Sequence, residues 1–124
     1  MTLKPLARWV LAIFFVVAGL NHFRSPETYL GMMPAWLPAP LLLNAIAGAG
    51  EVLGGIGLLW PVTRRAAMAG LVLLLIAVFP ANVHVALMGH MPGFGFSPAV
   101  LWLRLPVQAV FVAWTVWVGR TTGA

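Results

Sequence analysis

Four apolar stretches, each near the length that crosses a bilayer, constrain this chain more than any other feature of its sequence. They cover about residues 5–20, 41–60, 66–88 and 99–119, and a helix of roughly 20 apolar residues spans the hydrocarbon core of a membrane. Charged residues make up 7% of the sequence and hydrophobic residues 62%, whereas soluble domains carry about 25% charged residues. Because backbone groups in lipid must bond to one another, the sequence predicts an all-α, four-helix transmembrane bundle in one domain, 1–124.

The positive charges indicate how this bundle is oriented. The basic residues at one end of the predicted helices are Lys4, Arg8, Arg64, Arg65 and Arg120, and those at the other end are Arg24 and Arg104. The positive-inside rule therefore predicts a multi-pass protein of the cytoplasmic (inner) membrane, with both termini cytoplasmic and the lipid bilayer as its surroundings. Their spread along the chain argues against nucleic acid as a partner, since phosphate binding requires a clustered basic face. A signal peptide over the first stretch is disfavoured because no small-x-small cleavage site precedes Asn21.

The interfacial loop between helices 1 and 2, residues 21–40, is predicted to lie along the outer membrane surface. It holds too many prolines between positions 26 and 40 for one helix, yet it is rich in apolar and aromatic residues. Tyr29 and Trp36 are expected at headgroup depth as aromatic anchors. Two interpretations stay open, because this loop and the second outer loop, 89–98, serve either as anchored connectors or as a lid over a site among the helix ends.

Polar side chains inside the apolar stretches gather in the outer halves of the predicted helices. Glu51 lies near the middle of the second stretch, where an unpaired carboxylate is costly, so it must be protonated, paired or placed in a wet cavity. Asn44 lies seven residues earlier on nearly the same helix face. The third stretch carries Asn82 and His84, which point about 200° apart, and we expect Asn82 to face the bundle centre. The remaining polar residues of this half include His22, Arg104 and Gln108.

This polar cluster supports two hypotheses. In the structural hypothesis Glu51 pairs with Arg104, and the pair fixes the helix register. In the functional hypothesis an outward-facing pocket uses Arg104 and His22 to bind an anionic or carbonyl-bearing ligand, with Glu51 as a proton acceptor. A quinone head group fits such a pocket, because its carbonyls need hydrogen-bond donors and its reduction needs protons. Under the structural hypothesis Glu51→Gln loses folded protein, whereas under the functional one it loses binding.

Other kinds of site are disfavoured by the sequence. No two histidines stand three or four residues apart, so we predict no metal site. The chain has no cysteine, which excludes disulfides and thiolate sites. The pair Gly50-x-x-x-Gly54 predicts a close approach of a neighbouring helix backbone.

A series of short motifs resembles the DoxX-like family of small integral membrane proteins between about residues 19 and 108. The matching pieces are Gly19-Leu-Asn-His22-Phe23 with Pro26-Glu27, Met33-Pro34 with Leu37-Pro38, Gly48-Ala-Gly-Glu51 with Gly54-Gly55-Ile-Gly-Leu-Leu, Pro61-x-x-Arg64, Phe79-Pro80-Ala81-Asn82-Val83 and Arg104-Leu-Pro106-x-Gln108. The resemblance implies a four-helix membrane fold whose motifs include the polar cluster. The family's namesake looks like a subunit of a thiosulfate:quinone oxidoreductase, and other relatives are expected to assist membrane redox complexes or protein maturation.

The leading prediction is therefore a membrane subunit or accessory protein of redox metabolism with a polar pocket for a quinone or similar ligand. Its candidate binding residues are His22, Glu51, Asn82, Arg104 and Gln108. The alternative is a non-catalytic scaffold or assembly factor, in which the Glu51–Arg104 pair is structural and the outer loops contact a partner membrane or redox protein. A transporter is less favoured because four short helices show no inverted repeat.

Overall fold

A computed structural model describes residues 3–90 and 95–120. It confirms the predicted fold class, since the described residues form four long apolar helices, one short helix and no strand. All four long helices are long and apolar enough to cross a bilayer. The elements are α1 (Lys4–Arg24), α2 (Pro26–Met32), α3 (Pro40–Leu59), α4 (Arg64–Met88) and α5 (Pro98–Gly119).

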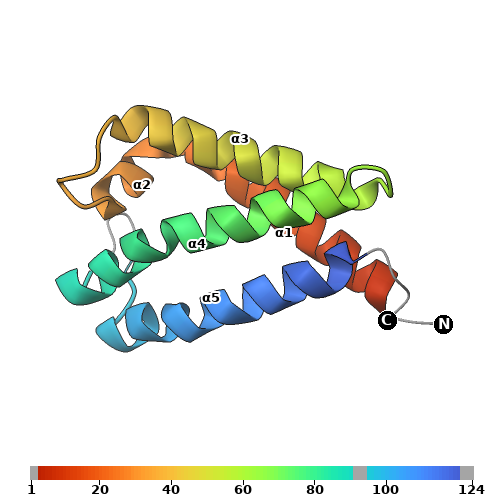
Figure 1. Cartoon of the computed structure of the whole chain (residues 1–124). Helices are drawn as coiled ribbons and strands as arrows, with labels where there is room; N and C mark the ends of the chain where they lie inside the picture. Colours follow the sequence, from red (N-terminus) through yellow and green to blue (C-terminus); the bar gives the residue numbers. More distant parts are fainter. Residues whose placement is uncertain (1–2, 91–94, 121–124) are drawn as a thin grey trace.

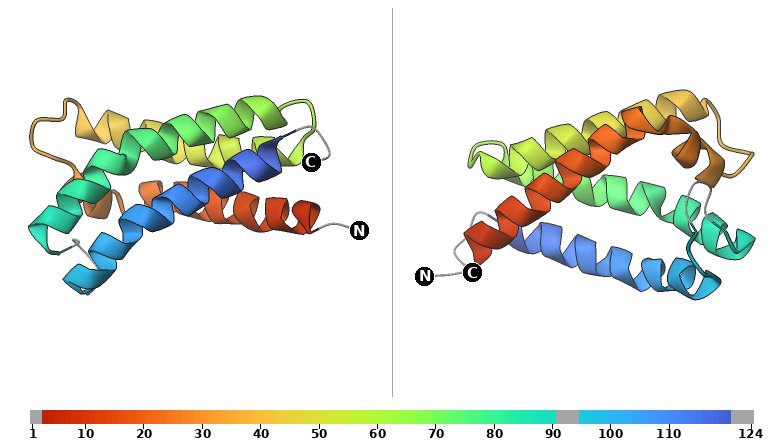
Figure 2. Two further views of the ribbon diagram at one scale, coloured as in Figure 1. Left: turned by 60° about the horizontal axis from the view of Figure 1, so that its bottom comes forward. Right: turned by 180° about the vertical axis from the view of Figure 1, so that it is seen from behind.

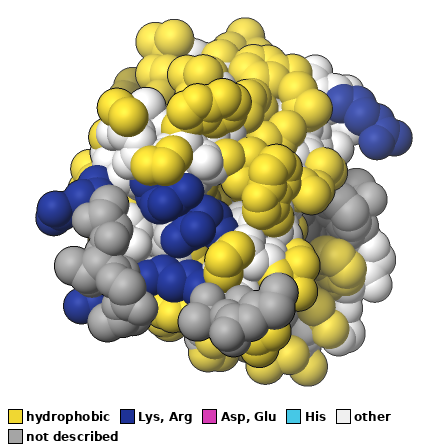
Figure 3. Space-filling view, turned by 90° about the vertical axis from the view of Figure 1, so that its right-hand side faces the viewer, with side chains coloured by type: hydrophobic (Ala, Val, Ile, Leu, Met, Phe, Trp, Pro, Cys, Tyr) yellow, Lys and Arg dark blue, Asp and Glu magenta, His cyan; other side chains and the backbone are white. Residues whose placement is uncertain are grey.

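The long helices lie side by side in an elongated bundle, with α1 packed most extensively on α3 and α4 packed on both α3 and α5 (Figures 1 and 2). The start of α1 and the end of α5 lie at the same end of the bundle, which we call the basic end because Lys4, Arg8, Arg64, Arg65 and Arg120 belong to it (Figure 3). The short helix α2 lies at the opposite end, which we call the α2 end (Figure 2).

Prolines mark where the helices begin. Pro5, Pro26, Pro40 and Pro98 each occupy one of the first two positions of a helix. There the fixed φ of proline suits the helix, and its missing N–H is not needed by an intrahelical bond. The longest helix, α4, ends instead at Gly89, whose φ of 80° provides a left-handed cap.

The segment between α1 and α3 differs in part from its prediction. As expected, it is not one continuous helix. Seven of its residues, Pro26–Met32, nevertheless form α2, because Pro26 stands at the first helical position, where proline is tolerated. Trp36 is 74% exposed, in keeping with an interfacial anchor. Tyr29 instead turns toward the bundle and stacks on the ring of His22.

Close contact between α1 and α3 depends on glycine. A Cβ added to Gly19 would lie 2.6 Å from the Gly48 carbonyl oxygen, and one added to Gly55 would lie 2.8 Å from the Ala12 carbonyl oxygen. The predicted pair Gly50 and Gly54 has another role, because both residues face leucine side chains of α4 rather than a helix backbone. The closest backbone approach therefore lies on the α1 side of α3, where small residues allow van der Waals packing in lipid.

Two apolar clusters fill the bundle interior, one in each half. Toward the basic end the buried cluster comprises Leu11, Phe15, Leu58, Leu71 and Val118. At the α2 end Tyr29 and Leu105 pack against a second buried cluster, formed by Met32, Val85, Ala86 and Leu101. The polar residues of the candidate site lie nearer the second cluster, in the half of each helix that leads to the α2 end.

Gly19→Ala is expected to destabilise the bundle, whereas Gly70→Ala is not. The new methyl group at position 19 would meet backbone atoms of α3, while nothing lies within 4 Å of a Cβ built on Gly70. Overpacking of this kind costs about 1–3 kcal/mol. Thermal unfolding in mild detergent, followed by circular dichroism, measures the difference, and equal melting temperatures for the two variants would contradict the proposed contact.

Candidate functional site

A buried histidine–glutamate pair connects α1 and α3. Glu51 lies near the middle of α3, and its Oε1 is 2.7 Å from Nε2 of His22, near the end of α1. The two side chains are 15% and 10% exposed. A carboxylate at this depth in a bilayer needs a compensating partner, and the imidazole supplies one by direct hydrogen bonding.

Asn44 fixes how the His22 ring is protonated. The Asn44 Nδ2 donates to the His22 carbonyl oxygen at 2.9 Å, and a carbonyl can only accept, so the amide orientation is determined. The Asn44 Oδ1, 2.8 Å from His22 Nδ1, must then accept a hydrogen bond from an N–H at that ring nitrogen. The tautomer with its proton on Nδ1 follows, and it leaves Nε2 to face Glu51.

The contact between His22 Nε2 and Glu51 Oε1 consequently holds one proton. If the carboxyl is ionised, Nε2 must donate and the ring is an imidazolium; if the ring is neutral, the carboxyl must be protonated and donate. Both forms of the pair are net neutral, which is the low-cost state inside a membrane. Within the described part of the chain, Glu51 Oε2 receives no hydrogen bond and retains accessible surface.

Tyr29 of α2 lies against this pair. Its ring stacks on the His22 ring with centroids 3.8 Å apart and an interplanar angle of 21°. Its hydroxyl oxygen accepts a hydrogen bond of 2.6 Å from Asn21 Nδ2. The short helix α2 is thus held against the end of α1, and its tyrosine shields one face of the imidazole.

A second polar group connects α4 and α5. Arg104 Nη2 donates to Asn82 Oδ1 at 3.2 Å, and Asn82 Nδ2 donates to Gln108 Oε1 at 2.7 Å. Gln108 Nε2 in turn donates to the Leu75 carbonyl oxygen at 2.6 Å. Arginine only donates and the backbone carbonyl only accepts. The side-chain amides of Asn82 and Gln108, which lie between them in this series of hydrogen bonds, therefore each have one possible orientation.

Pro80 lies beside this chain of hydrogen bonds. It lacks the N–H that would bond the Ile76 carbonyl, so the backbone of α4 is locally weakened there. The carbonyl that Gln108 takes belongs to the neighbouring Leu75. A side chain of α5 therefore supports the helix near its proline, as expected for proline in a transmembrane helix.

The structure thus divides the five predicted site residues into two groups. His22 and Glu51 form one, and Asn82, Arg104 and Gln108 form the other. The ion pair between Glu51 and Arg104, expected under the structural hypothesis, is not among the pairs that the described residues form, because the carboxylate takes His22 instead.

Two residues that position the site were not among the predicted binding residues. Asn44 was placed on the Glu51 face by its seven-residue spacing, but its bonds to His22 depend on how α1 lies across α3. Tyr29 was interpreted as a membrane anchor. No periodicity of the sequence places the tyrosine of a seven-residue helix on a histidine ring. Asn82 does face the bundle interior, as predicted, and is buried.

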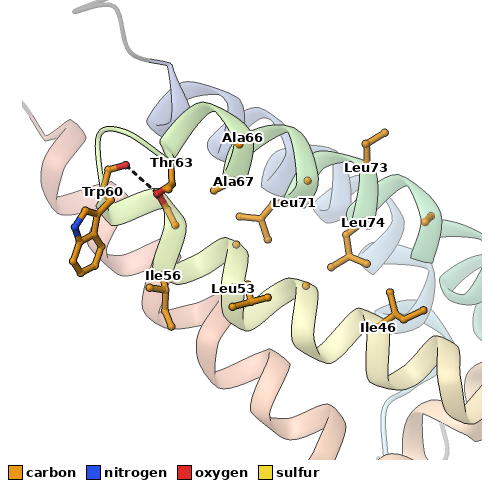
Figure 4. Close-up of a pocket in the computed structure, with 15 residues that line it drawn as sticks. Ile46, Leu53, Ile56, Trp60, Thr63, Ala66, Ala67, Leu71, Leu73 and Leu74 are labelled. Carbon is orange, nitrogen blue, oxygen red and sulfur yellow. Dashed lines mark hydrogen bonds between the residues drawn. The ribbon is translucent and has the colours of Figure 1, made fainter.

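An apolar groove lies elsewhere in the structure. It occupies about 940 Å³ between α3 and α4, and it runs from Ile46 to the turn at Trp60 and Thr63 (Figure 4). Leu53, Leu74 and other apolar side chains line it over a floor of small residues. None of the five predicted site residues lines this groove. Among the described residues, moreover, no three His, Asp or Glu side chains are grouped as a metal site requires.

Comparison with known protein families places the chain in one of them. A family model described as a domain of unknown function (DUF8561) matches residues 11–119, which include both polar groups. No curated protein and no solved structure matches the chain.

Glu51→Gln is expected to fold, in contrast to its predicted behaviour with an arginine partner. A glutamine amide can donate to neutral His22 Nε2, so the variant should change the free energy of unfolding by less than about 1.5 kcal/mol. Asn44→Ala leaves the Nδ1–H of His22 without its acceptor and should cost about 1–3 kcal/mol. Thermal unfolding in detergent measures both, with a substitution of the exposed Glu27 of α2, Glu27→Gln, as the matched control. The assigned hydrogen bonds would be contradicted if Glu51→Gln failed to fold while Asn44→Ala unfolded at the same temperature as the wild type.

Proposed function

We propose that this chain, which belongs to the DUF8561 family, is a membrane subunit or accessory protein of redox metabolism that binds a quinone or similar carbonyl-bearing ligand. The proposed binding site lies in the half of the bundle toward the α2 end. The resemblance to the DoxX-like proteins is part of the same proposal and leads to the same class of function.

The single-proton contact between His22 and Glu51 is the observation that carries this proposal. Reduction of a quinone to a quinol adds two electrons and two protons, and each proton must be delivered to a carbonyl oxygen inside the apolar phase. The His22–Glu51 pair holds one transferable proton within the bundle. The electrons would come from a partner redox protein, and the second proton would follow once the pair is protonated again.

Access to the pair supports the same conclusion. Glu51 keeps 15% of its side-chain surface exposed although it lies in the middle of α3. Its Oε2 is the acceptor through which a ligand hydroxyl or a water molecule could exchange a proton. In the second group, Arg104 is half-buried and is oriented through Asn82, so it can donate to a ligand carbonyl near the same end of the bundle.

A non-catalytic scaffold is the second candidate, and it is favoured by the α4–α5 polar group. Asn82 and Gln108 bond to each other, to Arg104 and to the Leu75 carbonyl, so each amide oxygen and each amide nitrogen has a partner inside the protein. Such bonds between transmembrane helices stabilise packing by themselves. In this function the exposed side chain of Trp36 would contact a partner membrane protein.

The expected location is the cytoplasmic (inner) membrane with the basic end in the cytoplasm. The excess of Lys and Arg at that end supports this orientation. A pocket near the α2 end would then face the outer leaflet, where a membrane-soluble quinone and external protons are both within reach.

A purified sample in mild detergent should retain a quinone or a related small molecule in a stoichiometric ratio. Mass spectrometry and absorbance detect it, and Arg104→Gln should weaken its binding about tenfold, the loss expected from one hydrogen bond of about 1.4 kcal/mol to a ligand carbonyl. Arg24→Gln, which removes the other basic residue of the α2 end, an exposed one, should bind as the wild type does. Protein that carries no small molecule and does not bind added ubiquinone or menaquinone would favour the scaffold.

Single-cysteine labelling tests the orientation without background, because the chain contains no cysteine. Val62, 93% exposed in the α3–α4 turn, and Glu27 on α2 lie at opposite ends of the bundle. A membrane-impermeant maleimide added to intact spheroplasts should label Glu27→Cys and spare Val62→Cys until the membrane is opened. The reverse pattern would place the basic end outside.

A further inference from the structure

The basic end of the bundle concentrates positive charge that no acidic side chain offsets. Five of the seven Lys and Arg residues belong to this end, and the two acidic residues of the sequence, Glu27 and Glu51, belong to α2 and to the middle of α3. Figure 3, which looks onto this end, shows Lys and Arg side chains grouped on its surface and no Asp or Glu side chain. The helices bring these residues, which are spread along the sequence, to one end of the bundle.

Two arginines of this end are held in place by the carbonyl ends of neighbouring helices. Arg8 of α1 donates from Nε to the Val118 carbonyl oxygen of α5 at 2.8 Å. Arg64 of α4 donates from Nε to the Leu58 carbonyl oxygen of α3 at 2.7 Å, and its Nη2 is 3.3 Å from the Leu59 carbonyl oxygen. Each guanidinium is thus anchored through its inner nitrogen, so its side chain is already ordered before a ligand binds.

The two anchored guanidinium groups belong to the same end of the bundle. Leu58 and Val118, whose carbonyl oxygens accept from them, belong to the same buried cluster, and the positive charges of Arg8 and Arg64 act on each other. Most N–H donors of the two groups are not used by the carbonyl bonds. Two fixed cations with unused N–H donors at one end of the bundle can give charge-assisted hydrogen bonds to the oxygen atoms of a phosphate group.

We propose that Arg8 and Arg64 together bind the phosphate of an anionic phospholipid at the basic end of the bundle. This site is separate from the proposed quinone site and does not depend on it. A phosphate between the two guanidinium groups would receive charge-assisted hydrogen bonds from both and would remove their mutual repulsion.

A lipid headgroup, rather than a soluble phosphate, fits the surroundings of the two arginines. Both lie at the ends of helices long enough to span a bilayer, where headgroup phosphates are found. Trp9 and Trp117, next in sequence to Arg8 and Val118, have exposed rings of the kind that lie at the membrane interface. The acyl chains of the lipid can extend along the exposed apolar faces of α1 and α5. The face of α1 includes Leu6 and Val10.

Native mass spectrometry of the full chain from mixed micelles of phosphatidylglycerol and phosphatidylcholine tests this site. The wild type should retain phosphatidylglycerol in preference to phosphatidylcholine. Arg8→Gln and Arg64→Gln should each weaken that binding about tenfold or more, because each removes charge-assisted hydrogen bonds. Arg65→Gln is the matched control, because Arg65 belongs to the same end and is exposed. This variant loses only general electrostatic attraction, so its affinity for phosphatidylglycerol should fall about fivefold or less.

Arg8→Lys keeps the positive charge but not the planar guanidinium, so its affinity for phosphatidylglycerol should fall between that of the wild type and that of Arg8→Gln. If the glutamine variants do not fold, this lysine variant and the lipid preference of the wild type decide the question. Equal retention of the two lipids by the wild type, or equal losses in all three glutamine variants, would overturn the proposal. Release of the bound lipid by millimolar inorganic phosphate would show a phosphate site that is not specific for lipid and would likewise overturn it.

Discussion

A carboxylate in the middle of a transmembrane helix needs a partner, and the contact that meets this need organises one half of the bundle. Glu51 pairs with His22, and Asn44 holds the histidine from the other side. This arrangement requires α1 and α3 to lie very close together. Gly19 and Gly48 provide that approach, since a Cβ at Gly48 would fall 2.9 Å from the Cβ of His22. The glycines and the polar pair therefore depend on each other, because larger residues would separate the helices and leave both polar groups without partners in lipid.

At the basic end of the bundle, arginine side chains bond to the carbonyl ends of neighbouring helices. Basic residues in the first turns of a helix are unfavourable for that helix, because its N-terminus already carries partial positive charge. Arg64 nonetheless occupies the first position of α4, and Arg8 lies one turn into α1; each donates to the carbonyl end of an antiparallel neighbour. The unfavourable interaction within one helix is offset by a favourable one with the next. This exchange also fastens α1 to α5 and α3 to α4 at the level of the membrane surface.

The sequence predicted the four spans and the burial of Asn82, because both follow from apolar length and from helical periodicity. It also predicted that Glu51 needs a partner, since that follows from the cost of charge in lipid. It did not identify the partner. Arg104 and His22 are both of suitable chemistry, and the choice between them depends on which helix lies beside α3, which is set by the glycine contacts of Gly19 and Gly55. The helix α2 was missed because seven residues beginning with proline carry too little periodicity to distinguish a helix from a loop.

The neutrality of the His22–Glu51 pair has a consequence for how the protein would respond to membrane voltage. With its proton the pair carries no net charge, so the transmembrane field exerts no net force on it. Without the proton it carries one negative charge partway across the membrane. A charge that crosses the whole membrane changes energy by about 2.3 kcal/mol per 100 mV, and a proton that enters or leaves this pair from one side crosses a fraction of that field. Under the proposed function, the depth of Glu51 in α3 would therefore make each proton transfer to or from the pair move charge through part of the membrane field.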